Sequence, residues 1–337
     1  MSPRPLFPRL EIGARLLCWM VLALVAGTPV RGAESAPTAS LIVVCGAGGE
    51  KDYDEAFAAW AENWRAAGTQ AGARVATIGG TEKPGADLEA MRAALAQESP
   101  VGTEPLWVVL LGHGTSDGQA AKFNLRGEDL TAAELAEWLA PLRRPVVVVA
   151  AFSASGAFLA PLSSAGRVLV VATKSGTEVN YARFGKFLSL AIGDPAADLD
   201  HDGQTSVLEA WLRAARLTEE FYASEGRLAT EHALLDDNGD GRGTPASWFR
   251  GLRLIKKTSD PAVPDGARAH QIHLLASPRE RDLSPEQRAE RNALELELAA
   301  LRESKSDLAE DQYYARLEAL LRRLARVYRG TKSGARD

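Results

Sequence analysis

Three short apolar runs that are rich in valine constrain the fold of this chain more than any other feature. They lie at residues 40–46 (SLIVVCG), 105–114 (PLWVVLLGHG) and 144–152 (RPVVVVAAF). A strand with one face in water alternates apolar and polar residues, whereas a strand of a parallel sheet that is covered on both faces is apolar throughout. Two further segments, at residues 74–80 and 167–176, have a similar character. We therefore predict a mainly parallel sheet that is buried between two layers of helices.

The segments between these runs carry helical patterns. Residues 53–68 (YDEAFAAWAENWRAAG) end at a glycine, which is a common helix stop. In residues 128–140, Thr131 is placed to cap a helix and Glu134 follows three positions later, which is the spacing of a capping box. The alternation of strands and helices predicts an α/β domain over residues 38–192, built as a three-layer α/β/α sandwich.

The first 32 residues have the layout of a signal peptide. Three arginines precede the apolar run LLCWMVLALVAG at residues 16–27, and small residues follow near Gly32. We expect cleavage there and export to the periplasm or the exterior, with an uncleaved anchor as the alternative. No later segment approaches the roughly 20 apolar residues that spanning a bilayer requires. We therefore predict that the mature form has no transmembrane span.

Charge and cysteine content restrict the partners and the chemistry. Removal of residues 1–32 takes away four arginines and one glutamate, so the formal charge changes from -5 to about -8. A negative charge of this size argues against a nucleic-acid partner. Of the two cysteines, Cys18 lies in the predicted leader and only Cys45 stays in the mature chain, so no internal disulfide is expected.

An acidic run of twelve residues matches the calcium loop of an EF-hand. Its predicted ligands, at positions 1, 3, 5, 7, 9 and 12, are Asp198, Asp200, Asp202, Gln204 through its main-chain carbonyl, Ser206 and Glu209. Gly203 supplies the sharp turn, and hard oxygen ligands favour Ca²⁺ as the cofactor. Thr205 departs from the aliphatic residue that is usual at position 8. We predict an EF-hand helix-loop-helix within residues 193–257, and a solvated acidic turn is the alternative.

A second acidic run resembles half of such a loop. Asp236, Asn238 and Asp240 repeat the first three ligand positions and Gly241 follows, but the twelfth position is Ser247. A polar turn and a weak calcium site both remain open for this run, and we favour the turn.

A histidine and a serine follow two of the long predicted strands. His113 comes directly after the strand at residues 105–111 and Ser153 directly after the strand at residues 144–152. The carboxyl ends of parallel strands lie at one edge of the sheet, where α/β proteins usually carry their sites. We therefore expect both residues to lie at this edge.

In these two motifs the chain resembles the legumain-like and caspase-like cysteine peptidases. His113-Gly114 is similar to the histidine motif of that family, and the run from Ser153 to Gly156 is similar to its Cys-x-Ser-Gly motif with serine at the nucleophile position. The resemblance covers about residues 40–190 and implies a caspase-like sandwich with a His113–Ser153 pair. A serine hydroxyl needs a well-aligned base that is usually held by a third group, and a thiol does not.

Two other residues are candidates for that chemistry. Asp117 in GTSDG could orient His113, although an aspartate beside glycine is more typical of a turn. Cys45 could replace the missing thiol, although strand cysteines are usually small buried apolar residues.

Three classes of function therefore remain. The first is an exported calcium-binding protein with a catalytically degenerate peptidase fold that binds a peptide or protein. The second is an active calcium-dependent hydrolase that uses Ser153 and His113. The third is a non-peptidase envelope protein whose sheet only displays the calcium module.

The sequence of the C-terminal region predicts a linker followed by a helical hairpin. Residues 258–283 contain TSDPAVPDG and are interpreted as a linker. Within residues 284–330, Ser284 is an N-cap with Pro285 at the first helical position, and a second helix is expected at about 308–328. The hairpin is interpreted as a packing or oligomerisation element, with a dedicated partner-binding coiled coil as the alternative.

Overall fold

The computed structural model describes residues 39–80, 85–118, 120–256 and 265–330. The predicted leader, residues 1–32, lies outside these ranges, so the prediction of a signal peptide stays a prediction. Within the described residues, no helix combines the length and the apolar character that a membrane span needs.

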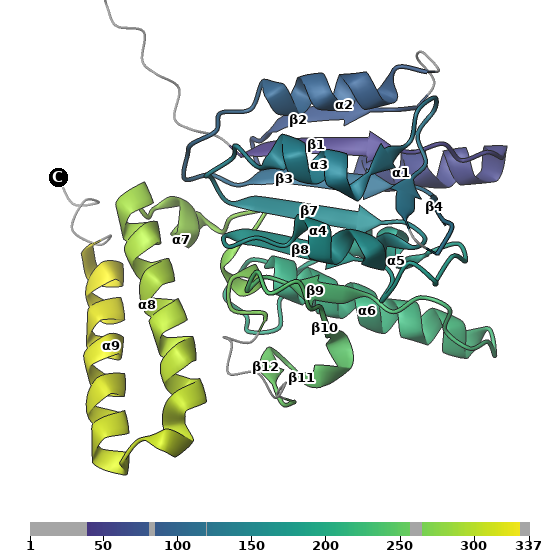
Figure 1. Ribbon diagram of the computed structural model, residues 1–337. Helices are drawn as coiled ribbons and strands as arrows, with labels where there is room; N and C mark the ends of the chain where they lie inside the picture. Colours follow the sequence, from purple (N-terminus) through teal and green to yellow (C-terminus); the bar gives the residue numbers. More distant parts are fainter. Residues whose placement is uncertain (1–38, 81–84, 119, 257–264, 331–337) are drawn as a thin grey trace, which may run out of the picture. The chain divides into compact units, whose positions relative to one another are not determined.

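A seven-stranded sheet forms the centre of the fold, with the strand order β10-β9-β8-β7-β3-β1-β2 (Figure 1). The neighbouring pairs from β2 to β8 are parallel, and β9 and β10 are antiparallel additions at one edge. The strands are β1 (Ser40–Cys45), β2 (Arg74–Ile78), β3 (Leu106–Leu111), β7 (Val146–Ala151), β8 (Arg167–Val171), β9 (Leu234–Asp236) and β10 (Thr244–Pro245). The prediction of a mainly parallel sheet is confirmed.

Helices cover both faces of the sheet. One face is packed against α1 (Lys51–Gln70), α5 (Phe184–Ala191) and α6 (Val207–Ser224). The other face is packed against α2 (Asp87–Ala96), α3 (Ala132–Leu139) and α4 (Leu159–Leu162). The protein is therefore an α/β/α sandwich, as the sequence predicts. The expected capping box of Thr131 and Glu134 is present at the start of α3.

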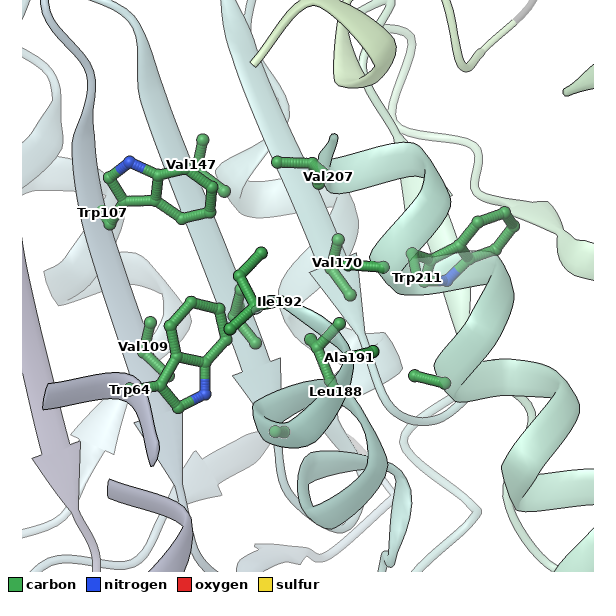
Figure 2. Close-up of a cluster of buried hydrophobic side chains, with 14 of the residues drawn as sticks. Trp64, Trp107, Val109, Val147, Val170, Leu188, Ala191, Ile192, Val207 and Trp211 are labelled. Carbon is green, nitrogen blue, oxygen red and sulfur yellow. The ribbon is translucent and has the colours of Figure 1, made fainter. Parts of the chain in front are cut away.

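The buried valine runs explain why this sheet needs two helical layers. In β7, Val147 and Val149 belong to the core beneath α1 and α5, whereas Val146 and Val148 belong to the core on the opposite face. Figure 2 shows the first of these cores, in which Trp64 of α1 lies near Trp107 of β3, with 6.1 Å between ring centroids. Burial of each such valine contributes about 1.5 kcal/mol or more, so neither helical layer is dispensable.

Two small groups of short antiparallel strands lie outside the central sheet. Three strands, β4 (Gly114–Ser116), β5 (Ala121–Phe123) and β6 (Leu130–Thr131), form a small sheet directly after β3. A two-stranded ribbon follows β10 and consists of β11 (Phe249–Arg250) and β12 (Arg253–Leu254). The sequence pattern did not indicate either element, because strands of two or three residues are too short to show alternation.

The C-terminal region contains α7 (Pro278–Arg281), α8 (Pro285–Glu303) and α9 (Glu310–Gly330), and α8 and α9 form a hairpin with its own apolar core. Residues 265–283 differ from the predicted linker, because Ala269 is fully buried and Glu280 pairs with Arg291 of α8. Arg288 of α8 also contacts Glu104, just before β3, at 2.8 Å. Proline and glycine suggested a linker, but long-range contacts order this segment.

Candidate functional site

His113 packs in a box of aromatic rings at the carboxyl end of β3. Its ring centroid lies 4.7 Å from that of Tyr53, 5.1 Å from that of Phe57 and 5.6 Å from that of Tyr181. Burial lowers the pKa of His113, and the Gly48 backbone and the Asp54 carboxylate oppose this effect only in part. His113 is therefore neutral at neutral pH, which is the form that accepts a proton.

Ser153 lies at the carboxyl end of β7 and is 2% exposed. The next residue, Ala154, has a left-handed backbone with φ of 61°, and its N–H donates to the Glu178 carbonyl at 2.8 Å. A left-handed alanine costs about 1 kcal/mol, so the surrounding contacts must hold this turn. The turn directs the chain away from the sheet directly after the serine.

The loops that carry His113 and Ser153 are in direct contact. Leu111 of β3 is paired with Ala151 of β7, so the two residues follow adjacent strand ends by the same two positions. A Cβ on Gly114 would lie 2.1 Å from the Ser153 carbonyl oxygen, which explains why glycine follows the histidine. The edge predicted for both residues is where the structure places them.

Proton transfer between these residues needs the Ser153 hydroxyl within hydrogen-bond reach of the His113 ring. Among the described residues, no hydrogen bond joins the Ser153 hydroxyl to the His113 ring. Asp117 accepts the Ala120 N–H at 2.8 Å and so closes the turn after β4, as expected for an aspartate beside glycine. The pairing of Ser153 with His113 as catalytic residues stays a prediction.

Cys45 is a buried residue at the end of β1. Its side chain is 6% exposed and its sulfur lies 3.9 Å from the Phe57 carbonyl oxygen. Burial raises the pKa of the Cys45 thiol to about 11, so the thiol stays protonated at neutral pH. Because the thiolate is the nucleophilic form, this environment favours a structural cysteine over a replacement nucleophile.

The predicted calcium loop connects α5 to α6. Carboxylate oxygens of Asp198, Asp200 and Asp202 converge within 4.8 Å of one another. The loop folds back on itself through backbone N–H groups: Gly203 donates to Asp198 at 3.0 Å, and Gly203 itself has φ of 90°. The helix that enters the loop, α5, ends at Ala191, and a single 3₁₀ turn at Pro195–Ala197 leads into the loop.

Glu209 closes the loop at the start of α6. It forms a capping box with Ser206, in which the Ser206 N–H donates to the Glu209 carboxylate at 2.8 Å. The other Glu209 oxygen accepts the Leu199 N–H at 2.8 Å. Glu209 is 1% exposed. The fourth predicted ligand residue, Gln204, donates through its side chain to Asp202 at 3.1 Å, which leaves its main-chain carbonyl as the predicted ligand.

A distant segment packs onto this loop and was missed by sequence reasoning. His270 Nε2 lies 3.0 Å from Asp200 Oδ2, and the His270 ring also lies within 4.8 Å of a Glu209 oxygen. The Ile272 carbonyl of the same segment accepts the Val207 N–H at 2.9 Å. The Ser277 N–H donates to the Gln204 side chain at 3.0 Å. We call residues 269–277 the strap, and no local spacing could have indicated its contact with a loop about 70 residues earlier.

The second acidic run forms a turn that resembles the first loop. Asp236 accepts the Gly239 N–H at 3.0 Å and the Gly241 N–H at 3.1 Å, and Asn238 accepts the Asp240 N–H at 2.8 Å. Its hydrogen bonds account for a polar turn. Binding of a second ion by this run stays a prediction.

The calcium loop and the His113–Ser153 edge lie at opposite ends of the strands. The α5 helix starts after the carboxyl end of β8 and returns along the sheet, so the loop that follows it lies at the amino-end edge (Figure 1). A strand of six residues spans about 20 Å. The two candidate sites are therefore separated by roughly that distance.

No family model and no curated protein matches the chain. Among solved structures, the Drosophila initiator caspase Dronc is similar with a TM-score of 0.40 and 13% identity, over 61% of this chain and 81% of that chain. A protein from Geobacter sulfurreducens is similar with a TM-score of 0.39 and 14% identity, over 54% of this chain and 89% of that chain. The α/β/α fold is established by the central sheet and the helices on its two faces.

Proposed function

We propose that this chain is an exported calcium-binding protein with an α/β/α sandwich, in which the edge near His113 and Ser153 binds a peptide or protein and does not cleave it. The observation that carries the proposal is the convergence of three aspartate carboxylates within 4.8 Å in a twelve-residue loop.

The charge of the loop supports a bound cation. Burial raises the pKa of Asp202, and the nearby carboxylates of Asp200 and Glu209 raise it further, while hydrogen bonds from Gln204 lower it. Like charges at this distance are unfavourable unless a proton or a cation compensates them. A divalent cation would relieve this repulsion at neutral pH, where protonation does not.

The donor set fits calcium. Carboxylates of Asp198, Asp200 and Asp202, the Gln204 carbonyl and the Glu209 carboxylate would supply hard oxygen ligands. The Ser206 hydroxyl donates to Glu209 at 2.8 Å, so position 9 would act through water, as it often does. Export fits a site of modest affinity, because extracellular calcium modules work at dissociation constants of about 10⁻⁴ to 10⁻³ M.

The surroundings of the loop support a structural role for the ion. The loop is bound to the strap through His270 and Ser277, and the strap leads into α7 and the hairpin. The His113–Ser153 edge is about one strand length away. Calcium would therefore order the strap, and direct bracing of that edge has no support.

The edge itself supports binding over hydrolysis. Ser153 is 2% exposed and no hydrogen bond among the described residues links it to His113. The rings of Tyr53 and Tyr181 beside His113 offer apolar contacts of the kind that peptide sites use. A hydrolase with Ser153 as the nucleophile is the second candidate, supported by the contact between the two loops.

Calorimetric titration of the purified chain with Ca²⁺ tests the proposal. Glu209→Gln removes one negative charge and keeps a capping residue, because Gln also serves at the third position of a capping box. The matched control is Glu219→Gln, on the exposed side of the same helix. We expect the first variant to bind at least about tenfold more weakly and the control to match the parent. Equal binding by all three proteins would refute the site.

A further inference from the structure

The α9 helix carries two apolar faces, and only one of them is used within the hairpin. Tyr313, Leu320 and Val327 are buried against α8 and form the core of the hairpin. The second face, which we call the outer seam, contains Tyr314, Leu321 and Ala325 at helical spacing, together with Leu317, which also packs against the hairpin core. They line a shallow groove on the surface of α9.

The outer seam exposes large side chains to solvent. Tyr314 is 49% exposed and Leu321 is 47% exposed. Single exposed apolar residues are common, but a continuous apolar seam along a helix marks an interaction surface. Glu318 and Arg322 flank it and pair with each other at 2.6 Å.

The distribution of charge along α9 identifies the chemistry that fits the seam. The helix begins with Glu310 and Asp311, whereas the two arginines that line the groove, Arg322 and Arg329, lie in its last nine positions. A second copy of α9 in antiparallel orientation would bring acidic residues against basic ones. A parallel copy would bring like charges together, which is unfavourable.

We infer that the outer seam is a contact between two copies of this chain that pack antiparallel about a two-fold axis. Along α9, this axis lies at the level between residues 319 and 320. This axis places Tyr314 opposite Ala325 of the second copy, a large side chain against a small one. It also places Glu318 beside Arg322 of the second copy, on the same flank of the seam. The surface is thus self-complementary in shape and in charge, as a two-fold interface requires.

The resulting assembly is a four-helix bundle made from two hairpins. The α9 helix has 21 residues, and a helix of this size is about 31 Å long. Bundles of this type pack with apolar seams and short loops, and the hairpin provides both. Because the seam offers only a few apolar residues from each copy, we expect a dissociation constant on the order of micromolar.

Sedimentation equilibrium of the purified chain from about 1 to 200 µM tests this contact. We expect the parent to dimerise and Leu321→Glu to dissociate at least about tenfold more readily, because the charge would be buried at the centre of the seam. Ala319→Glu is the matched control, since it adds the same charge on the exposed far side of the same helix. Ellipticity of all three proteins checks that the hairpin stays helical.

Reversal of the flanking charges tests the orientation. Glu318→Arg and Arg322→Glu alone should each weaken the dimer several-fold, and the double variant should restore it, because antiparallel packing exchanges the two residues. A monomeric parent over the whole range would overturn the inference and leave the seam to another partner. So would a dimer that Leu321→Glu and Ala319→Glu affect equally, or a double variant weaker than both single variants.

Discussion

Asp265 gives the sharpest prediction about stability. It is 5% exposed, and its carboxylate accepts the Asp237 N–H at 2.9 Å and the Thr244 hydroxyl at 2.5 Å. Burial, with the carboxylates of Asp237 and Asp236 nearby, raises the pKa of Asp265 to about 7. Asp237 is also buried and accepts the Ala269 N–H at 2.7 Å, so both carboxylates hold the start of the strap region to the turn after β9.

The sign of the pH dependence follows from this raised pKa. The folded protein holds the Asp265 proton up to about pH 7, whereas the unfolded chain loses it near pH 3.8. The stability that protonation provides is therefore present below about pH 4 and is lost as the pH rises to about 7. A difference of this size is worth at most about 4 kcal/mol, and relaxation around the ionised pair should reduce it to roughly 2 to 3 kcal/mol.

Asp265→Asn isolates this contribution, because the amide imitates the protonated acid and can still bond Thr244. Urea denaturation in chelator at pH 5 and pH 8 measures the free energy of unfolding. From pH 5 to pH 8, we expect the parent to lose about 2 kcal/mol more of its free energy of unfolding than the variant does. Asp311→Asn, an exposed change on α9, is the control and should show a constant difference. If Asp265→Asn also shows a constant difference, Asp265 is ionised in the folded protein throughout this range.

Two further predictions concern the edge near Ser153. Ala154→Gly should leave the free energy of unfolding within about 0.5 kcal/mol of the parent, because relief of the left-handed backbone offsets the lost methyl group. Ala150→Gly, a buried strand change, should cost about 1 to 2 kcal/mol in the same urea experiment. Against a fluorogenic peptide library, the parent and Ser153→Ala should show no cleavage, and cleavage by the parent that Ser153→Ala abolishes would contradict the binding proposal. Cleavage by Ser153→Cys alone would show that the dyad geometry is intact.

Much of the fold could be predicted because burial on both faces leaves a direct record in the sequence. Residues 146–151 are uninterrupted Val and Ala, and β7 places alternate members of this run in the two cores. The capping box at Thr131 and the N-cap at Ser284 are equally local signals, and both are present. Each of these signals lies within a few residues of the element that it specifies.

Contacts between distant segments could not be predicted in this way. The strap residues His270 and Ser277 meet the calcium loop about 70 residues away, and nothing in their own spacing indicates that contact. Pro and Gly near residue 264 suggested a linker, since composition reports local backbone preference and not what a segment packs against. The relative orientation of the Ser153 and His113 side chains could not be predicted either. Adjacent strands place the two backbones at one edge, but the orientations of the hydroxyl and the ring depend on the side chains around them.

The separation of the two candidate sites constrains how calcium could act. An ion between α5 and α6 would fix the loop that the strap contacts, and the strap continues through Glu280 and Arg291 into the hairpin. The His113–Ser153 edge is connected to the loop only indirectly, through the packed sheet and through α5, which begins three residues after Tyr181, among the described residues. The strap, in contrast, contacts the loop by direct hydrogen bonds. Loss of calcium should therefore loosen the strap and the hairpin before it changes the edge. Because the proposed self-contact lies on α9, calcium and assembly would then be linked through the same segment, while peptide binding at the opposite edge stays independent of both.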